Sequence, residues 1–144
     1  MELAVAFQLS RPETTVGVTR GALRLFEGLG YATLLEVSLP NGRRADLMGL
    51  GPKGEVVIAE VKSSLDDYRV DQKWPEYGPY CDAFYFAVPP EFPRDILPEE
   101  PGLIAADAFG GAVLRPAPVT ALAPARRKSL TLAFARLAAF RASD

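Results

Sequence analysis

The stretch TLLEVSLPNGRRADLMGLGPKGEVVIAEVK, residues 33–62, contains three strand-like runs separated by two turns of the same design. Pro40-Asn41-Gly42 and Pro52-Lys53-Gly54 each begin with proline and end with glycine. Proline suits the first central position of a type I turn, and glycine suits the left-handed position that follows it in a three-residue hairpin loop. The stretch therefore predicts a meander of three antiparallel strands, approximately residues 31–39, 43–50 and 55–62.

The predicted loops also indicate which residues face each other across the strands. If the first loop has three residues, Leu39 pairs with Arg43 and Glu36 lies opposite Asp46. A three-residue second loop places Asp46 opposite Glu60. Opposed residues have Cβ atoms about 5 Å apart, and ionised acids at that distance repel unless a cation or a raised pKa relieves them. The row of acids therefore predicts a divalent metal site.

The other face of the meander is consistent with this register, because the same pairing gives it only apolar residues. They form two rows: Leu35, Leu47 and Ala59, then Val37, Ala45 and Val61. A competing register takes Asn41-Gly42 as a two-residue type I′ loop and sends Glu36 to the far face. The place of Glu36 thus depends on the first turn, since a one-residue slip moves every side chain across the sheet.

Length and composition are those of one globular domain spanning residues 1–144, with 49% hydrophobic residues. No run approaches the roughly 20 apolar residues of a membrane span, and the N-terminus lacks the pattern of a secretory leader. We therefore expect a cytoplasmic protein without membrane partners.

The absence of histidine, together with a single cysteine, Cys81, narrows the chemistry. Zinc sites rich in histidine or cysteine and nucleophilic catalysis assisted by histidine are excluded. A bound metal would have to be held by oxygen atoms, which favours Mg²⁺ or Mn²⁺. The net charge of −2 is not itself a nucleic-acid signature, but basic residues gather near the C-terminus and at Arg43 and Arg44.

The flanking sequence predicts further helices and strands. The apolar residues of 1–18 follow no clear period, which suggests an arm. Those of residues 19–30 have helical spacing, and this segment ends at a glycine. Ser64 and Asp67 form a capping box for a crossover helix to about Trp74, with a possible short extension through Tyr80. An apolar run at 83–88 predicts a buried strand beside the meander. Short strands at 102–106 and 112–114 around a Gly110-Gly111 turn, and a helix at 124–141, complete the chain.

The order of these elements, with Asp46 on the second strand and Glu60-Val61-Lys62 on the third, resembles the PD-(D/E)xK nuclease superfamily. The resemblance implies an α/β fold with a restriction-endonuclease-like core: helix, three-stranded antiparallel meander, crossover helix, further strands and C-terminal helix. Ala45 stands where the motif has proline. The resemblance implies that Asp46 and Glu60 hold Mg²⁺, that Lys62 positions or activates water, and that Glu36 completes the metal site.

A longer stretch, GRRADLMGLGPKGEVVIAEVKSSLDDYRVDQKWPEY followed by CDAFYFAVP, is similar to the MmcB-type family of DNA-repair endonucleases. This resemblance implies a Mg²⁺-dependent deoxyribonuclease that hydrolyses phosphodiester bonds in DNA repair, with DNA and a repair protein as partners. A homodimer would suit cutting of both strands. The expected DNA-contacting residues are Arg44, Gln72, Lys73, Arg126, Arg127 and Lys128.

Two alternatives remain open from the sequence. A non-catalytic DNA-binding or scaffolding module could retain the nuclease fold. The charged residues Asp46, Glu60 and Lys62 could also form an ion-paired group at the edge of a sheet, although this leaves the acidic row with too little positive charge. Intact acids together with Lys62 favour the nuclease.

Overall fold

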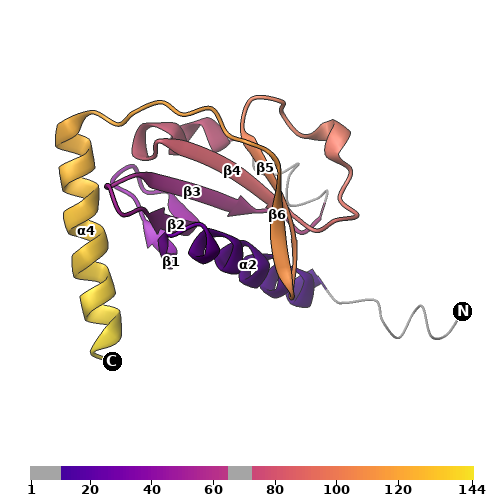
Figure 1. Ribbon diagram of the computed structural model, residues 1–144, viewed down its shortest axis with the longest axis horizontal. Helices are drawn as coiled ribbons and strands as arrows, with labels where there is room; N and C mark the ends of the chain where they lie inside the picture. Colours follow the sequence, from indigo (N-terminus) through magenta and orange to yellow (C-terminus); the bar gives the residue numbers. More distant parts are fainter. Residues whose placement is uncertain (1–10, 65–72) are drawn as a thin grey trace, which may run out of the picture.

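The fold was obtained as a computed structural model, which describes residues 11–64 and 73–144. Its centre is one six-stranded mixed sheet in which the strands lie side by side in chain order (Figure 1). The strands are β1 (Ala32–Ser38), β2 (Arg44–Leu50), β3 (Val56–Val61), β4 (Ala83–Val88), β5 (Gly102–Asp107) and β6 (Gly110–Arg115). Two α-helices, α2 (Arg11–Gly28) and α4 (Pro124–Ala142), and two short 3₁₀ helices, η1 (Trp74–Tyr80) and η2 (Arg94–Ile96), complete the described elements.

The meander has the predicted register. Leu34 pairs with Met48 across β1 and β2, and Leu47 pairs with Ala59 across β2 and β3. Gly42 and Gly54 have φ angles of 85° and 87°, which is the left-handed conformation expected at the end of each three-residue loop. Asn41 has no positive φ, and this excludes the competing type I′ loop.

Parallel pairing begins after the meander. β4 runs parallel to β3, and β5 runs parallel to β4, whereas β6 returns antiparallel to β5. The predicted buried strand beside the meander is thereby confirmed. Asp67 of the predicted capping box, and most of the helix that was predicted to follow it, lie outside the described residues.

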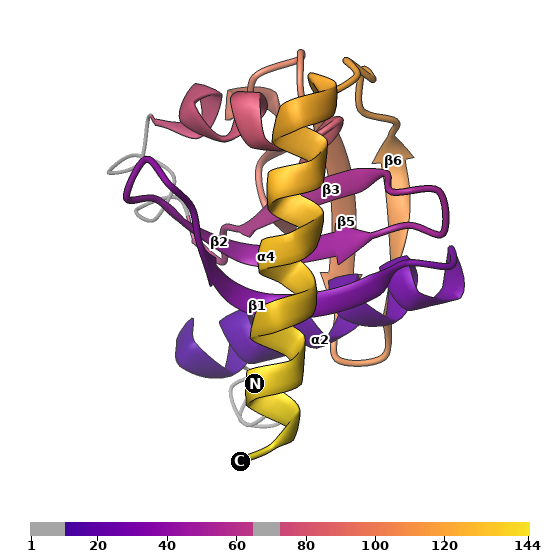
Figure 2. The same ribbon diagram turned by 90° about the vertical axis from the view of Figure 1, so that its left-hand side faces the viewer.

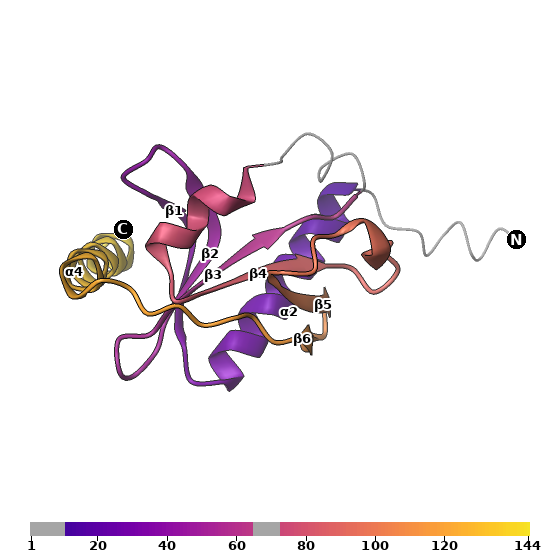
Figure 3. The ribbon, with the colours of Figure 1, turned by 90° about the horizontal axis from the view of Figure 1, so that it is seen from above.

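Two apolar cores cover the two faces of the sheet. On one face, Leu130 and Phe134 of α4 pack with Met48 and with residues of η1. On the other face, Val18 and Phe26 of α2 pack with other strand residues. Seen from above, α2 and α4 lie on opposite sides of the first strands (Figure 3), and α4 crosses in front of the sheet (Figure 2). Among the described residues, no helix is long and apolar enough to cross a membrane.

The first helix begins earlier than predicted. α2 starts at Arg11, so residues 11–18 are helical and not part of an arm. Pro12 is compatible with this because it lies in the first turn, where an amide hydrogen would have no helical partner. Val18, at a four-residue spacing from Ala22, is buried and continues the apolar face of the helix.

Two other predictions need correction. Val37 and Ala45 pack into the core that contains Met48, and not into the core of Leu47. Glu36, with φ 51°, interrupts the alternation of β1 just before Val37, and Ala45 is the partner of Val37. The turn between β5 and β6 is formed by residues 108–109, and Gly110 already pairs with Asp107.

Candidate functional site

Asp46 and Glu60 occupy the place where the regular pairing of β2 with β3 stops. The last backbone pair there is Leu47 with Ala59. Beyond it, the backbone N–H of Asp46 donates to Oε1 of Glu60 at 2.9 Å, and the N–H of Val61 donates to Oδ2 of Asp46 at 2.8 Å. The carboxylates therefore take the place of strand carbonyls, which fixes both side chains between the two strands.

The environment of Glu60 is unusual for an acid. Only 4% of the residue is exposed. Burial, followed by the negative charge of Asp46, raises the pKa of the Glu60 carboxyl well above its ordinary value, and the nearby charge of Lys62 opposes part of this shift. Two acids held together in a buried place bind a proton or a cation more readily than separate surface acids.

Lys62 follows directly after β3. Its backbone N–H donates to the Ala87 carbonyl at 3.0 Å, so the main chain is held against β4. The residue is 7% exposed, and a lysine this buried is unusual unless its charge interacts with other groups. The structure thus brings together Asp46, Glu60 and Lys62, as predicted from the sequence.

Glu36 does not join this group. Within residues 11–64 and 73–144, no set of three or more acidic, cysteine or histidine residues is placed to hold a metal ion. Glu36 is exposed, and its positive φ disturbs the strand at the position predicted to oppose Asp46. Its carbonyl, with that of Leu35, accepts hydrogen bonds from Arg141 at the end of α4.

A contact between α2 and the end of β3 was not predicted. The Thr15 hydroxyl lies 2.7 Å from that of Ser63, the residue after Lys62. Thr19 donates its hydroxyl to the Thr15 carbonyl one turn earlier in the same helix. Thr15 and Ser63 are 48 positions apart in the sequence. Their proximity could have been suggested only by recognising that residues 11–18 are helical.

The predicted DNA-contacting residues do not lie together. Arg44 is exposed on β2, two positions before Asp46, and Lys73 is exposed before η1. Gln72 lies outside the described residues. The remaining three, Arg126, Arg127 and Lys128, belong to the first turns of α4.

The first turns of α4 lie away from the acids. Arg127 donates to the Gly54 carbonyl, before the start of β3, whereas Glu60 is near its end. Six residues of strand separate these positions by about 20 Å, and Figure 1 shows α4 beyond the starting end of β3. Arg126 donates to the Pro79 carbonyl and lies over the Tyr80 ring, so its guanidinium packs against the chain itself.

Asp82, which is buried, and Arg127, which is half-buried, form a second polar group. The guanidinium donates to both carboxylate oxygens, at 2.6 and 2.8 Å, and Asp82 also accepts from the backbone N–H groups of Val56 and Leu122. These hydrogen bonds, led by those of Arg127, lower the pKa of Asp82 to about 2. Each carboxylate oxygen of Asp82 accepts two hydrogen bonds from within the fold, and Asp82 therefore anchors α4 to the sheet.

The donor set of Asp46 and Glu60 fits a hard divalent cation. It consists of carboxylate oxygens, and Mg²⁺ is commonly held by one or two carboxylates while it keeps several waters. A cation would also offset the negative charge of Asp46, which together with the larger effect of burial raises the pKa of Glu60. The two acids together, without Glu36, are therefore a sufficient protein contribution to such a site.

A sequence profile of the family described as "DNA repair protein MmcB-like" matches residues 4–144. The chain belongs to the MmcB-like family. This membership confirms the family predicted from the sequence and indicates a role in DNA repair.

The fold is shared with a solved structure. A protein of unknown function from Silicibacter pomeroyi is 43% identical, with a TM-score of 0.85 over 94% of this chain and 90% of that chain. Among curated proteins, no sequence match was found.

Proposed function

We propose that this protein is a metal-dependent endonuclease of the PD-(D/E)xK type that hydrolyses DNA phosphodiester bonds during repair. The observation that supports the proposal most directly is the juxtaposition of two carboxylates, Glu60 accepting from the Asp46 backbone and Asp46 accepting from the Val61 backbone, with Lys62 two residues after Glu60. The order of elements around these residues, with an antiparallel meander followed by a parallel strand, is the order that this superfamily implies.

The charges of the site suit phosphodiester hydrolysis. Mg²⁺ or Mn²⁺ held by Asp46 and Glu60 would supply a lowered pKa for bound water and stabilisation of charge on the phosphate. Lys62 contributes a positive charge that orients the attacking water or stabilises the charge developing on the phosphate oxygens. Burial strengthens this contribution, because an ammonium group interacts more strongly where water is excluded.

The polar residues near the candidate site favour recognition of the DNA backbone over recognition of the base sequence. Arg44 is exposed next to the acids and is a suitable phosphate contact. Near Lys62, the hydroxyls of Thr15 and Ser63 contact each other. We therefore propose selection of DNA by its structure, or by a repair partner, over selection of a long sequence.

Cleavage of a DNA panel tests the proposal. Plasmid, flap, forked and single-stranded DNA are incubated with the protein and either Mg²⁺ or Mn²⁺, and Asp46→Asn and Lys62→Ala are compared with wild type. Glu76→Gln is the matched control, because Glu76 is an exposed acid that pairs with Arg43. Metal-dependent cutting that is lost in both site variants and kept in the control supports the nuclease.

The other outcomes separate the competing functions. DNA binding without cutting of any substrate would favour the non-catalytic module. Absence of cutting, of metal binding and of DNA binding would overturn the metal-site proposal and leave the acids as a structural group.

A further inference from the structure

The chain just after β3, which carries Lys62, is held by more than one element. On the side of β2, regular backbone pairing ends at Ala59. On the side of β4, the backbone N–H of Lys62 donates to the Ala87 carbonyl. Helix α2 provides a further contact, because the Thr15 hydroxyl lies 2.7 Å from that of Ser63. The position of this part of the chain therefore depends on α2 as well as on the sheet.

The side chains of β3 alternate between the two faces of the sheet. Three of them belong to the core shared with α2: Val57, Ala59 and Val61. Ile58 belongs to the core on the other face. Continued beyond the strand, this alternation directs Ser63 towards α2 and Lys62 towards the opposite face, on which Glu60 lies. The contact between Ser63 and α2 agrees with this direction.

Thr15 belongs to the face of α2 that packs on the sheet. The buried residues of this face follow one another at helical spacing: Val18, Ala22 and Phe26. Thr15 comes three positions before Val18 and extends the same face. Its hydrogen bond to Ser63 is therefore the polar end of an otherwise apolar contact between α2 and β3. A hydrogen bond restricts direction as well as distance, so it fixes Ser63 more narrowly than apolar packing does.

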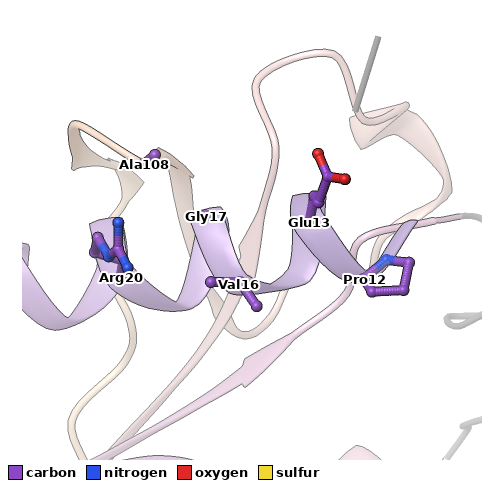
Figure 4. A pocket seen from close by; sticks show the side chains of 6 residues that line it. All are labelled: Pro12, Glu13, Val16, Gly17, Arg20 and Ala108. Atoms are coloured by element: carbon purple, nitrogen blue, oxygen red, sulfur yellow. The ribbon is translucent and has the colours of Figure 1, made fainter. Parts of the chain in front are cut away.

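The other sides of α2 hold the helix in place against the turn between β5 and β6. An open hollow of about 320 Å³ lies between the helix and this turn (Figure 4), and it is lined by Pro12, Glu13, Val16, Gly17, Arg20 and Ala108. Gly17 packs against Ala108, since a Cβ built at Gly17 would lie 3.4 Å from the Ala108 nitrogen. Arg24 donates to the carbonyl of Phe109 in the same turn. Thr15 is thus carried by a helix that is itself fixed to the sheet.

We propose that Thr15 is a positioning residue that orients Lys62 through Ser63, and its effect on cleavage rests on the proposed function. Ser63 and Lys62 are neighbours whose side chains face opposite sides, so rotation of the chain at Ser63 swings Lys62 away from Glu60. The hydrogen bond between the hydroxyls of Thr15 and Ser63 opposes this rotation. Such positioning matters for catalysis, because a displacement of about 1 Å can reduce a rate about 100-fold.

Nuclear magnetic resonance of the lysine side chains tests the positioning without reference to cleavage. The lysines of the chain are Lys53, Lys62, Lys73 and Lys128. Labelling with carbon-13 lysine therefore gives few signals, and the signal that is missing from Lys62→Met belongs to Lys62. Thr15→Val replaces the hydroxyl with a methyl group and should move the Lys62 signal alone. Thr19→Val is the matched control, because the Thr19 hydroxyl donates to a carbonyl of its own helix, and it should move no lysine signal.

Cleavage kinetics test the consequence for the candidate nuclease. Thr15→Val should lower kcat at least about tenfold, while the KM for DNA and the affinity for Mn²⁺ stay close to those of wild type, because the acids keep their places. Thr15→Ser retains the hydroxyl and should retain most of the wild-type kcat. Ser63→Ala removes the same hydrogen bond, so the double variant Thr15→Val/Ser63→Ala should be no slower than the slower single variant.

Three results would overturn the positioning role of Thr15. They are a Lys62 signal that does not move in folded Thr15→Val, a kcat of this variant equal to that of wild type, and a Thr15→Ser variant as slow as Thr15→Val. A wild type that cuts no DNA would instead overturn the proposed nuclease, and the Lys62 signal would still decide whether Thr15 positions this lysine. Far-ultraviolet circular dichroism of each variant establishes that it is folded.

Discussion

The Glu60 side chain accepts a hydrogen bond from the backbone of Asp46, while the Asp46 side chain accepts one from the backbone of Val61. Each acid therefore has a structural role in addition to its charge. The two roles can be separated experimentally, because glutamine at position 60 retains an oxygen that can accept the Asp46 hydrogen bond.

We expect Glu60→Gln to remain folded and to lose nuclease activity. The substitution removes one of two like charges from a buried place, so the free energy of unfolding should stay within about 1 kcal/mol of wild type or rise. Cleavage should fall at least about 100-fold, because a charge-stabilising group in the site is removed. Urea unfolding and cleavage rates measure the two effects. A variant that unfolds more easily by several kcal/mol would show that the charge itself stabilises the fold.

Lys62 is expected to act through its charge and its position. Lys62→Met keeps the length and apolar stem, and should reduce cleavage at least about 100-fold. Lys62→Arg keeps the charge but places it in a planar, bulkier group, so activity should recover only in part. Cleavage rates with saturating metal measure both variants. If Lys62→Met cuts DNA as fast as wild type, the lysine has only a structural role.

The Asp82–Arg127 pair should contribute stability that depends on pH. Asp82 has a pKa of about 2 in the folded protein, below that of an ordinary aspartate near 3.9. A group whose pKa is lowered by folding stabilises the protein above its unfolded pKa, and this contribution is lost as the pH falls from about 4 to about 2. Asp82→Asn should therefore lower the free energy of unfolding by about 2 to 3 kcal/mol at pH 7, and the difference from wild type should shrink below pH 4.

Urea unfolding of both proteins between pH 7 and pH 3 measures this difference. Glu76→Gln is the control, since its pairing with Arg43 is on the surface and should contribute less than about 1 kcal/mol. A constant difference between wild type and Asp82→Asn across this pH range would contradict the assignment of the stabilisation to the ionised carboxylate.

The meander could be predicted because residues close together in the sequence determine its turns and its register. Pro40 and Gly42, like Pro52 and Gly54, determine the turn type, and the turn type determines the register. Strand β4 was recognised because a short apolar run with several aromatic residues has few alternatives. The juxtaposition of Asp46 and Glu60 followed from the register that the two turns determine, although the regular strand pairing stops one residue before them, at Leu47 and Ala59.

The remaining features depend on contacts between distant parts of the chain. Glu36 adopts a positive φ that no local signal indicates, and its carbonyl is bound by Arg141, 105 positions away. The start of α2 was missed because Thr15 and Gly17 carry no apolar pattern, although both are placed by contacts with other elements. Arg127 was predicted as a DNA contact, yet its guanidinium is engaged by Asp82.

The close approach of α2 to the β5–β6 turn gives a final prediction about Gly21. A Cβ at this position would overlap the carbonyl oxygens of Asp107 and Gly110, which belong to backbone and cannot rotate away. Gly21→Ala should therefore lower the free energy of unfolding by about 1 to 3 kcal/mol or more, despite the better helix propensity of alanine.

Gly28, the last residue of α2, is the matched control because a Cβ there meets no atom within 4 Å. Gly28→Ala should leave stability unchanged or raise it by up to about 1 kcal/mol, as expected from helix propensity alone. Thermal and urea unfolding of the two variants compare the same substitution in the same helix. Equal stability of the two would mean that α2 can move away from the β5–β6 turn at little cost.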